Sequence, residues 1–69
     1  MTQCERIMEY MKTEGSITSW EAMRELGCMR LASRIADLKK MGVQIESRTV
    51  TDRNRFGEVT HFTRYSIKQ

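Results

Sequence analysis

Apolar side chains near the start of the chain recur at a helical period. Four of them occupy positions i, i+3, i+4 and i+7, which places them on one face of an α-helix. They are Cys4, Ile7, Met8 and Met11. Thr2 and Glu5 have the spacing of a capping box, which predicts that the helix begins at Gln3. Gly15 is expected to end it after about three turns.

Two more helical stretches follow, and Gly27 separates them. Thr18 and Glu21 repeat the capping-box spacing and predict a short helix over residues 19–26. A helix of about two turns is unstable alone in water, so it must dock on its neighbours. A third helix is predicted over residues 30–41, with three aliphatic side chains facing inward. They are Leu31, Ile35 and Leu38.

After Gly42 the period of the apolar positions changes from helical to alternating. The alternation over residues 43–50 predicts a strand, and residues 52–57 have the composition of an exposed loop. Residues 58–67 are rich in β-forming side chains, so the two runs predict an antiparallel hairpin. Residues 16–18 are too few for more than a strand stub or a turn. The predicted fold is therefore α+β, with three helices followed by a β-hairpin.

The length of the chain limits what it can do. Its 69 residues contain no proline, linker or repeat, so we expect one domain over residues 1–69. A domain of this size leaves little room for an enzyme pocket. The sequence has no glycine-rich phosphate loop or nucleophile motif, and its one histidine, His61, has no catalytic partner at a credible spacing. We expect no enzyme activity, no cofactor and no small-molecule substrate.

The two cysteines and the hydropathy of the chain bear on its compartment. Cys4 and Cys28 form no CxxC pair and have no histidine cluster beside them, so we expect neither a metal site nor a disulfide. No apolar run approaches the roughly 20 residues that span a bilayer. The first residues also lack the features of a signal peptide. These features predict a cytoplasmic protein without a membrane partner.

Charge is distributed unevenly along the chain. Residues 1–28 carry a net charge of −2, whereas residues 29–69 carry +5, which together give the overall +3. An acidic first half and a basic second half favour a negatively charged partner that touches one face of the domain.

A short helix, a glycine turn and a longer basic helix form the pattern of a helix-turn-helix. The third helix is narrow enough to enter a major groove about 12 Å wide, where base edges are read by hydrogen bonds. Its predicted outward side chains are candidate DNA contacts. They are Met29, Arg30, Ser33, Arg34, Asp37 and, at the C-terminal end, Lys40. Asp37 would either accept a hydrogen bond from cytosine or pair with Arg34 or Lys40, and the pairing is favoured.

The predicted hairpin adds a second set of candidate DNA contacts. They are Arg48, Arg53, Asn54 and Arg55. A basic hairpin beside a recognition helix can follow the phosphate backbone or enter the neighbouring minor groove. The alternative is that this charge only keeps an exposed hairpin soluble.

Residues 26–30 and 35–42 resemble the core of winged helix-turn-helix domains. Over nearly its whole length the chain is similar to small stand-alone helix-turn-helix proteins of bacteriophages and prophages. The resemblance implies a β-wing and binding of duplex DNA through the third helix, in a bacterial cytoplasm. It implies a transcription regulator or an accessory protein of DNA transactions, as a possible homodimer or within a larger nucleoprotein complex.

The resemblance also has one departure. Ile35 and Leu38 follow Gly27 by more residues than the inward aliphatic residues of many such domains. This shift favours Ser33 and Arg34 as reading residues over Arg30 and Asp37.

A protein-docking module on the same scaffold is the second hypothesis, because fold does not fix function. An exposed apolar patch would favour it, and the residues to watch are Trp20, Met29, Phe56 and Phe62. Trp20 is expected to pack in the core instead. The same is expected of four methionines, which are Met8, Met11, Met23 and Met41.

Overall fold

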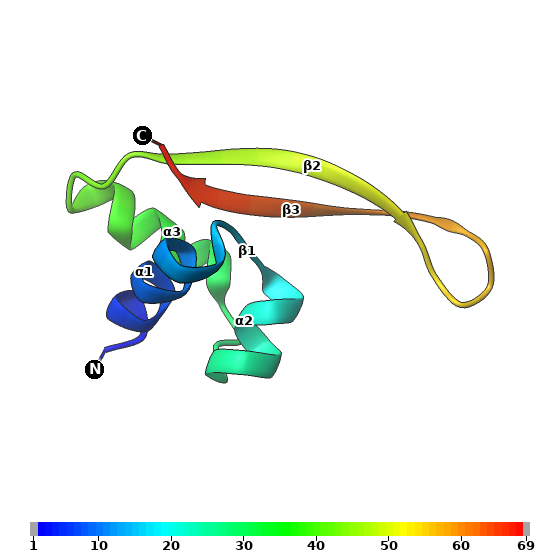
Figure 1. The fold of residues 1–69 in the computed structure, drawn as a ribbon, viewed down its shortest axis with the longest axis horizontal. Coiled ribbons are helices and arrows are strands. Elements are labelled where there is room, and N and C mark those ends of the chain that lie inside the picture. The colour runs from blue at the N-terminus through cyan, green and yellow to red at the C-terminus, as the bar shows by residue number, and fades with distance from the viewer. Residues whose placement is uncertain (1, 69) are drawn as a thin grey trace.

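A computed structural model describes residues 2–68. Three helices are followed by a long β-hairpin, which confirms the predicted α+β fold (Figure 1). The elements are α1 (Gln3–Glu14), β1 (Ile17–Thr18), α2 (Ser19–Leu26), α3 (Leu31–Lys40), β2 (Ile45–Arg53) and β3 (Val59–Ile67). The three strands form one antiparallel sheet in the order β1-β3-β2.

The capping boxes predicted from the sequence start both of the first two helices. The hydroxyl of Thr2 accepts the Glu5 backbone N–H at 3.2 Å, and the Glu5 carboxylate accepts the Thr2 N–H at 3.1 Å. Thr18 and Glu21 repeat this exchange at the start of α2. Gly27 ends α2 in the left-handed conformation, with φ of 67°, which glycine adopts without steric cost.

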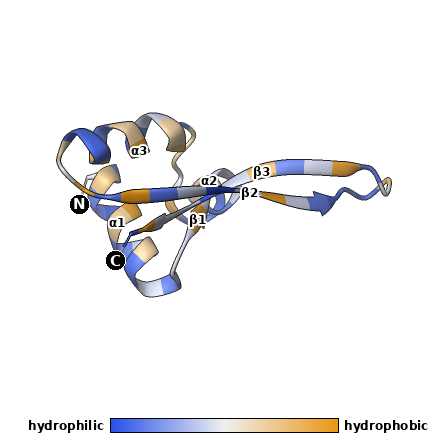
Figure 2. Cartoon of the chain, turned by 90° about the horizontal axis from the view of Figure 1, so that it is seen from above, coloured by the Kyte–Doolittle hydropathy of each residue, from blue (hydrophilic) through white to orange (hydrophobic). Residues whose placement is uncertain are grey.

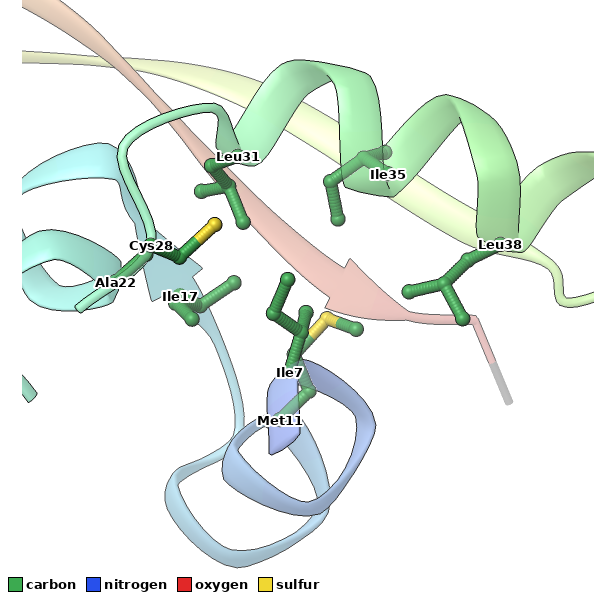
Figure 3. Packing of buried hydrophobic residues seen from close by; sticks show 8 residues of the cluster. All are labelled: Ile7, Met11, Ile17, Ala22, Cys28, Leu31, Ile35 and Leu38. Atoms are coloured by element: carbon green, nitrogen blue, oxygen red, sulfur yellow. The ribbon is translucent and has the colours of Figure 1, made fainter. Parts of the chain in front are cut away.

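The core lies where the three helices meet β1 (Figure 3). Its eight buried side chains are Ile7, Met11, Ile17, Ala22, Cys28, Leu31, Ile35 and Leu38. The helical periods in the sequence therefore identified the buried faces of α1 and α3 correctly. Cys4 and Met8 are partly buried against the same cluster.

Three residues expected in the core are exposed instead. Trp20 is 62% exposed, Met23 40% and Met41 71%. Ala22 is the buried residue of α2, and at 100° per residue Trp20 points almost directly away from it. Met41 follows Leu38, the last inward residue of α3. These three predictions were wrong because a two-turn helix and a helix end each bury only a narrow stripe.

The hairpin of β2 and β3, here called the wing, is paired from Ile45 opposite Ile67 to Arg53 opposite Val59. Its base packs against the helices, and the rest projects well beyond them (Figure 1). Polar and apolar bands alternate along both strands into the projecting part (Figure 2). We call the three helices, β1 and the base of the wing the body.

β2 lies further along the chain than the sequence predicted, because it begins at Ile45 and leaves Val43 and Gln44 outside the strand. Asp52 and Arg53, expected in the loop, continue β2, so the loop spans residues 54–58. Asn54 shapes this loop: its side-chain oxygen accepts the backbone N–H groups of Phe56 at 2.9 Å and Glu58 at 3.1 Å. A local turn of this kind leaves the flanking residues free to pair as strands.

Candidate nucleic-acid interface

The side of α3 that points away from the core is polar or carries small residues. Arg30 lies at the N-cap of α3, is exposed and makes no side-chain capping bond. Met29 before it is 78% exposed. Ala32, Ala36 and Lys40 are also exposed. Because alanine side chains are short, another surface can approach this face closely, with Arg30 at one end and Lys40 at the other.

Arg34 and Asp37 form an ion pair on the flank of α3. The Arg34 Nη2 atom lies 3.2 Å from Asp37 Oδ2, and the two side chains are 38% and 44% exposed. Within residues 2–68 the buried Arg34 Nε has no hydrogen-bond partner. The favoured pairing of Asp37 is thus present, and it neutralises a carboxylate that would otherwise repel phosphate.

This ion pair changes the order of the candidates on α3. Ser33 and Arg34, the positions that the sequence favoured as reading residues, are only half-exposed, whereas Arg30 is exposed. An arginine needs both terminal nitrogens free to bind guanine with two bonds. By exposure, Arg30 is the better placed of the two arginines.

The four candidate contacts of the wing divide into two groups. All four are exposed, but only Arg48 and Arg55 make no side-chain hydrogen bond within residues 2–68. Arg53 donates from Nη1 to the Gly57 carbonyl at 2.8 Å, and Asn54 uses both ends of its side chain within the loop. Arg53 and Asn54 therefore build the tip, and Arg48 and Arg55 have guanidinium groups directed at solvent.

Acidic side chains on the wing offset part of this charge. Asp52 accepts the Arg53 backbone N–H at 2.8 Å, and Glu58 accepts from the Asn54 side chain at 3.3 Å. Both carboxylates are engaged in local hydrogen bonds of the tip. These hydrogen bonds leave the charges in place, so residues 45–67 carry a net charge of +1, from Arg48, Arg53, Arg55 and Arg64 against Glu46, Asp52 and Glu58.

Arg64 connects the wing to the helix-turn-helix, a role that the sequence gave no reason to assign. Its Nη1 donates to Ser16 Oγ at 2.9 Å and to Glu21 Oε1 at 3.2 Å. Glu21 is the capping residue of α2, so one carboxylate holds both the start of that helix and β3. Partners 43 and 48 residues away along the chain leave no local sequence signal.

The same contact affects Arg48, which lies directly opposite Arg64 in the sheet. Like charges opposite one another in neighbouring strands repel. Since Glu21 and Ser16 bind Arg64 on the side of the body, Arg48 is the cation of this pair that is left to solvent.

Trp20 and Phe62 line a shared cavity of about 420 Å³ between the first turn of α2 and the wing. Asp52 and Arg64 also line it. The tryptophan is the largest exposed aromatic surface near the base of the wing. Phe56, which is 78% exposed, lies in the loop at the tip of the wing.

Residues 2–68 contain no group of three or more His, Cys, Asp or Glu side chains placed to hold a metal ion. In the same range no helix has the length and apolar character required to cross a bilayer. Cys28 is buried and Cys4 half-buried, both as free thiols.

The arrangement of three helices, an exposed third helix and a projecting hairpin defines a winged helix-turn-helix. Residues 2–69 match the family model described as a winged helix-turn-helix domain, and the chain belongs to this family. No curated protein and no solved structure matches the chain. Domains of this family generally bind DNA and are typically non-catalytic.

Proposed function

We propose that this single domain binds duplex DNA in a sequence-specific manner, with α3 in the major groove and the wing along the neighbouring backbone. The observation that carries the proposal is the exposed face of α3, where small side chains lie between Arg30 and Lys40. A helix with such a face can approach base edges closely enough for hydrogen bonding.

The wing supports the proposal through its reach and its charge. Each strand has nine residues, which corresponds to about 30 Å at about 3.3 Å per residue. The domain is 39 Å long in its longest dimension, compared with 24 and 21 Å in the other two. Arg48 along this length and Arg55 at its tip would bind phosphates of the backbone beside the groove.

The biological role that fits this activity is regulation of transcription or assistance in a DNA transaction. The resemblance to small phage and prophage proteins supports a role in the DNA of a phage or prophage, inside a bacterial cell. One copy offers one reading helix and a few cations, so its affinity should be low and sensitive to salt. A dimer on a two-fold site, or a larger nucleoprotein complex, would supply the missing affinity.

The test is binding of a labelled random-sequence duplex, measured by fluorescence anisotropy at about 50 and 200 mM salt. Four neutralised phosphates predict a log–log slope near −3.6, which is a loss of about a hundredfold over this range. Arg6→Gln on α1 is the matched control and should leave the slope unchanged. Absence of binding at the lower salt, even at high micromolar protein, would contradict the proposal.

The Trp20–Phe62 cavity supports a second candidate, a protein-docking module on the same scaffold. Exposed aromatic surface next to a concave site is typical of protein interaction sites. The salt titration distinguishes the candidates, because a module that only docks a protein would leave the duplex unbound even at the lower salt.

A further inference from the structure

A groove lies between α1 and the end of α3, and its walls are largely apolar. It has a volume of about 570 Å³ and is open to solvent within the described residues. Its apolar lining consists of Cys4, Met8, Leu38, Met41 and Val43. The start of α1 and the end of α3 lie at the opposite end of the molecule from the wing tip (Figure 1), so the groove is remote from the proposed wing contacts, although it borders Lys40 on α3.

The charged residues of this groove all come from α1. They are Glu5, Glu9 and Lys12. Glu5 and Lys12 are about two helical turns apart on one side of α1, and Met8 lies between them. Two such helices, packed antiparallel about a two-fold axis near Met8, would place Glu5 of each copy opposite Lys12 of the other. The side of α1 that carries Glu5, Met8 and Lys12 is therefore self-complementary, as a two-fold interface requires.

We propose that this groove is a homodimer interface, occupied by α1 of a second copy of the chain. Met8 and Met41 have flexible side chains that can fill the groove of the partner. Glu9 also lines the groove and lies next to the proposed axis, so the Glu9 carboxylates of the two copies repel each other and keep the dimer weak. Two carboxylates against one ammonium group make the same groove unfavourable for DNA.

The proposal concerns the oligomeric state in the absence of DNA, so it stands or falls independently of the proposed function. Sedimentation velocity from about 10 µM to about 1 mM protein should show a reversible monomer–dimer equilibrium, because the apolar lining is small for an obligate interface. A chain that stays monomeric over this whole range would overturn the proposal.

A charge reversal tests the pairing of the two helices. Lys12→Glu places a carboxylate opposite Glu5 at two symmetric positions and should weaken the dimer about tenfold or more. Glu5→Lys combined with Lys12→Glu should restore dimerisation to within about threefold. Because that double variant also changes the cap of α1, a second double variant, Glu5→Gln with Lys12→Glu, is measured as a control. Glutamine keeps the capping bond, and this pair should recover part of the loss.

The apolar part of the interface is tested with a matched pair of methionines. Met41→Glu, at an exposed position in the groove, should weaken the dimer about tenfold, whereas Met23→Glu, on α2 outside it, should not. Thermal unfolding by circular dichroism identifies variants that are folded. A dimer that is equally stable in folded Lys12→Glu and Met41→Glu variants would place the interface elsewhere and overturn the proposal.

Discussion

The body and the projecting part of the wing are built on different principles. All eight buried apolar side chains belong to the helices, β1 and the turn before α3, whereas residues 48–62 include none that is buried. The projecting part is held by strand pairing and by the hydrogen bonds of its tip. The body therefore supplies most of the folding stability, and the outer wing is free to be shaped by what it binds.

Charge is divided along a different line, between the first two helices and the rest of the molecule, since residues 1–28 carry −2 and residues 29–69 carry +5. The acidic residues of α1 and α2 lie in the body, and the exposed Arg48 and Arg55 lie in the wing. Arg64 bridges this division through Glu21. A substitution in the buried core of the body should therefore act chiefly on folding, whereas one on the exposed face of α3 or on the outer wing should act chiefly on binding.

Loss of a core side chain should have the largest effect. Ile35→Ala removes a buried aliphatic group and should lower the free energy of unfolding by about 2–5 kcal/mol. Val59→Ala, at a half-exposed position in the wing, should cost no more than about 0.5 kcal/mol. Urea unfolding followed by circular dichroism measures both. Equal losses would show that the outer wing is as tightly packed as the body.

The exposed end of α3 should show the next largest effect, on binding rather than on folding. Arg30→Ala should weaken binding to a selected DNA site by about 1–3 kcal/mol and relax specificity at one base pair, if Arg30 binds a base. Its melting temperature should stay unchanged, because the side chain is exposed. Unchanged affinity in a titration with the selected duplex would remove Arg30 from the reading face.

The contact between Arg64 and Glu21 should contribute about 0.5–1 kcal/mol, since both side chains are partly exposed. A double-mutant cycle of Arg64→Met and Glu21→Gln isolates this coupling, because glutamine preserves the capping box of α2. Arg64→Met should also weaken DNA binding without changing its salt slope. A slope reduced by about 0.9 would instead place Arg64 on a phosphate.

Removal of a single wing cation should act mainly on the salt dependence of DNA binding. Arg48→Gln and Arg55→Gln should each make the log–log salt slope shallower by about 0.9 and leave unfolding unaffected. Arg53→Gln should disturb the tip, since its guanidinium group donates to the Gly57 carbonyl. Anisotropy titrations at several salt concentrations separate these outcomes, and an unchanged slope for both exposed arginines would remove the wing from the DNA.

The smallest effect is expected in the titration of Tyr10, a residue of α1 whose acidic neighbours lie on α1 and α2. Burial raises the pKa of its phenol above 10.0, and the charges of Glu21, Glu14 and Glu25 add to this while Arg64 opposes it. A raised pKa in the folded state means that its stabilisation is complete below pH 10.0 and is lost as the pH rises through the raised value. Ultraviolet titration in a Tyr65→Phe background should show the raised pKa of Tyr10, and a pKa at or below 10.0 would contradict this account.

Much of the body could be predicted from the sequence because its signals are local. Two capping boxes indicated the starts of α1 and α2, Gly27 indicated the end of α2, and the bounds of α3 were wrong by one residue at each end. The inward faces of α1 and α3 followed from their periods. Trp20 was wrongly expected in the core because hydrophobicity alone does not show which face of a short helix is buried. On α2 only Ala22 is buried.

The site was less predictable because its details depend on contacts between distant residues. Asp37 was correctly paired, since its partner lies one helical turn away. The engagement of Asn54 and Arg53 in the tip depends on the loop geometry, and the Arg64 contact depends on how β3 lies beside α2. Which arginines remain exposed is therefore a property of the folded domain.

The central claim is that DNA touches α3 and the wing and leaves α1 free. Amide chemical-shift mapping of labelled protein with a duplex tests it most directly. The account predicts large shifts over residues 29–40 and 48–59, and little change over residues 3–14. Shifts concentrated on α1, or none in α3 under conditions where the duplex is bound, would contradict it.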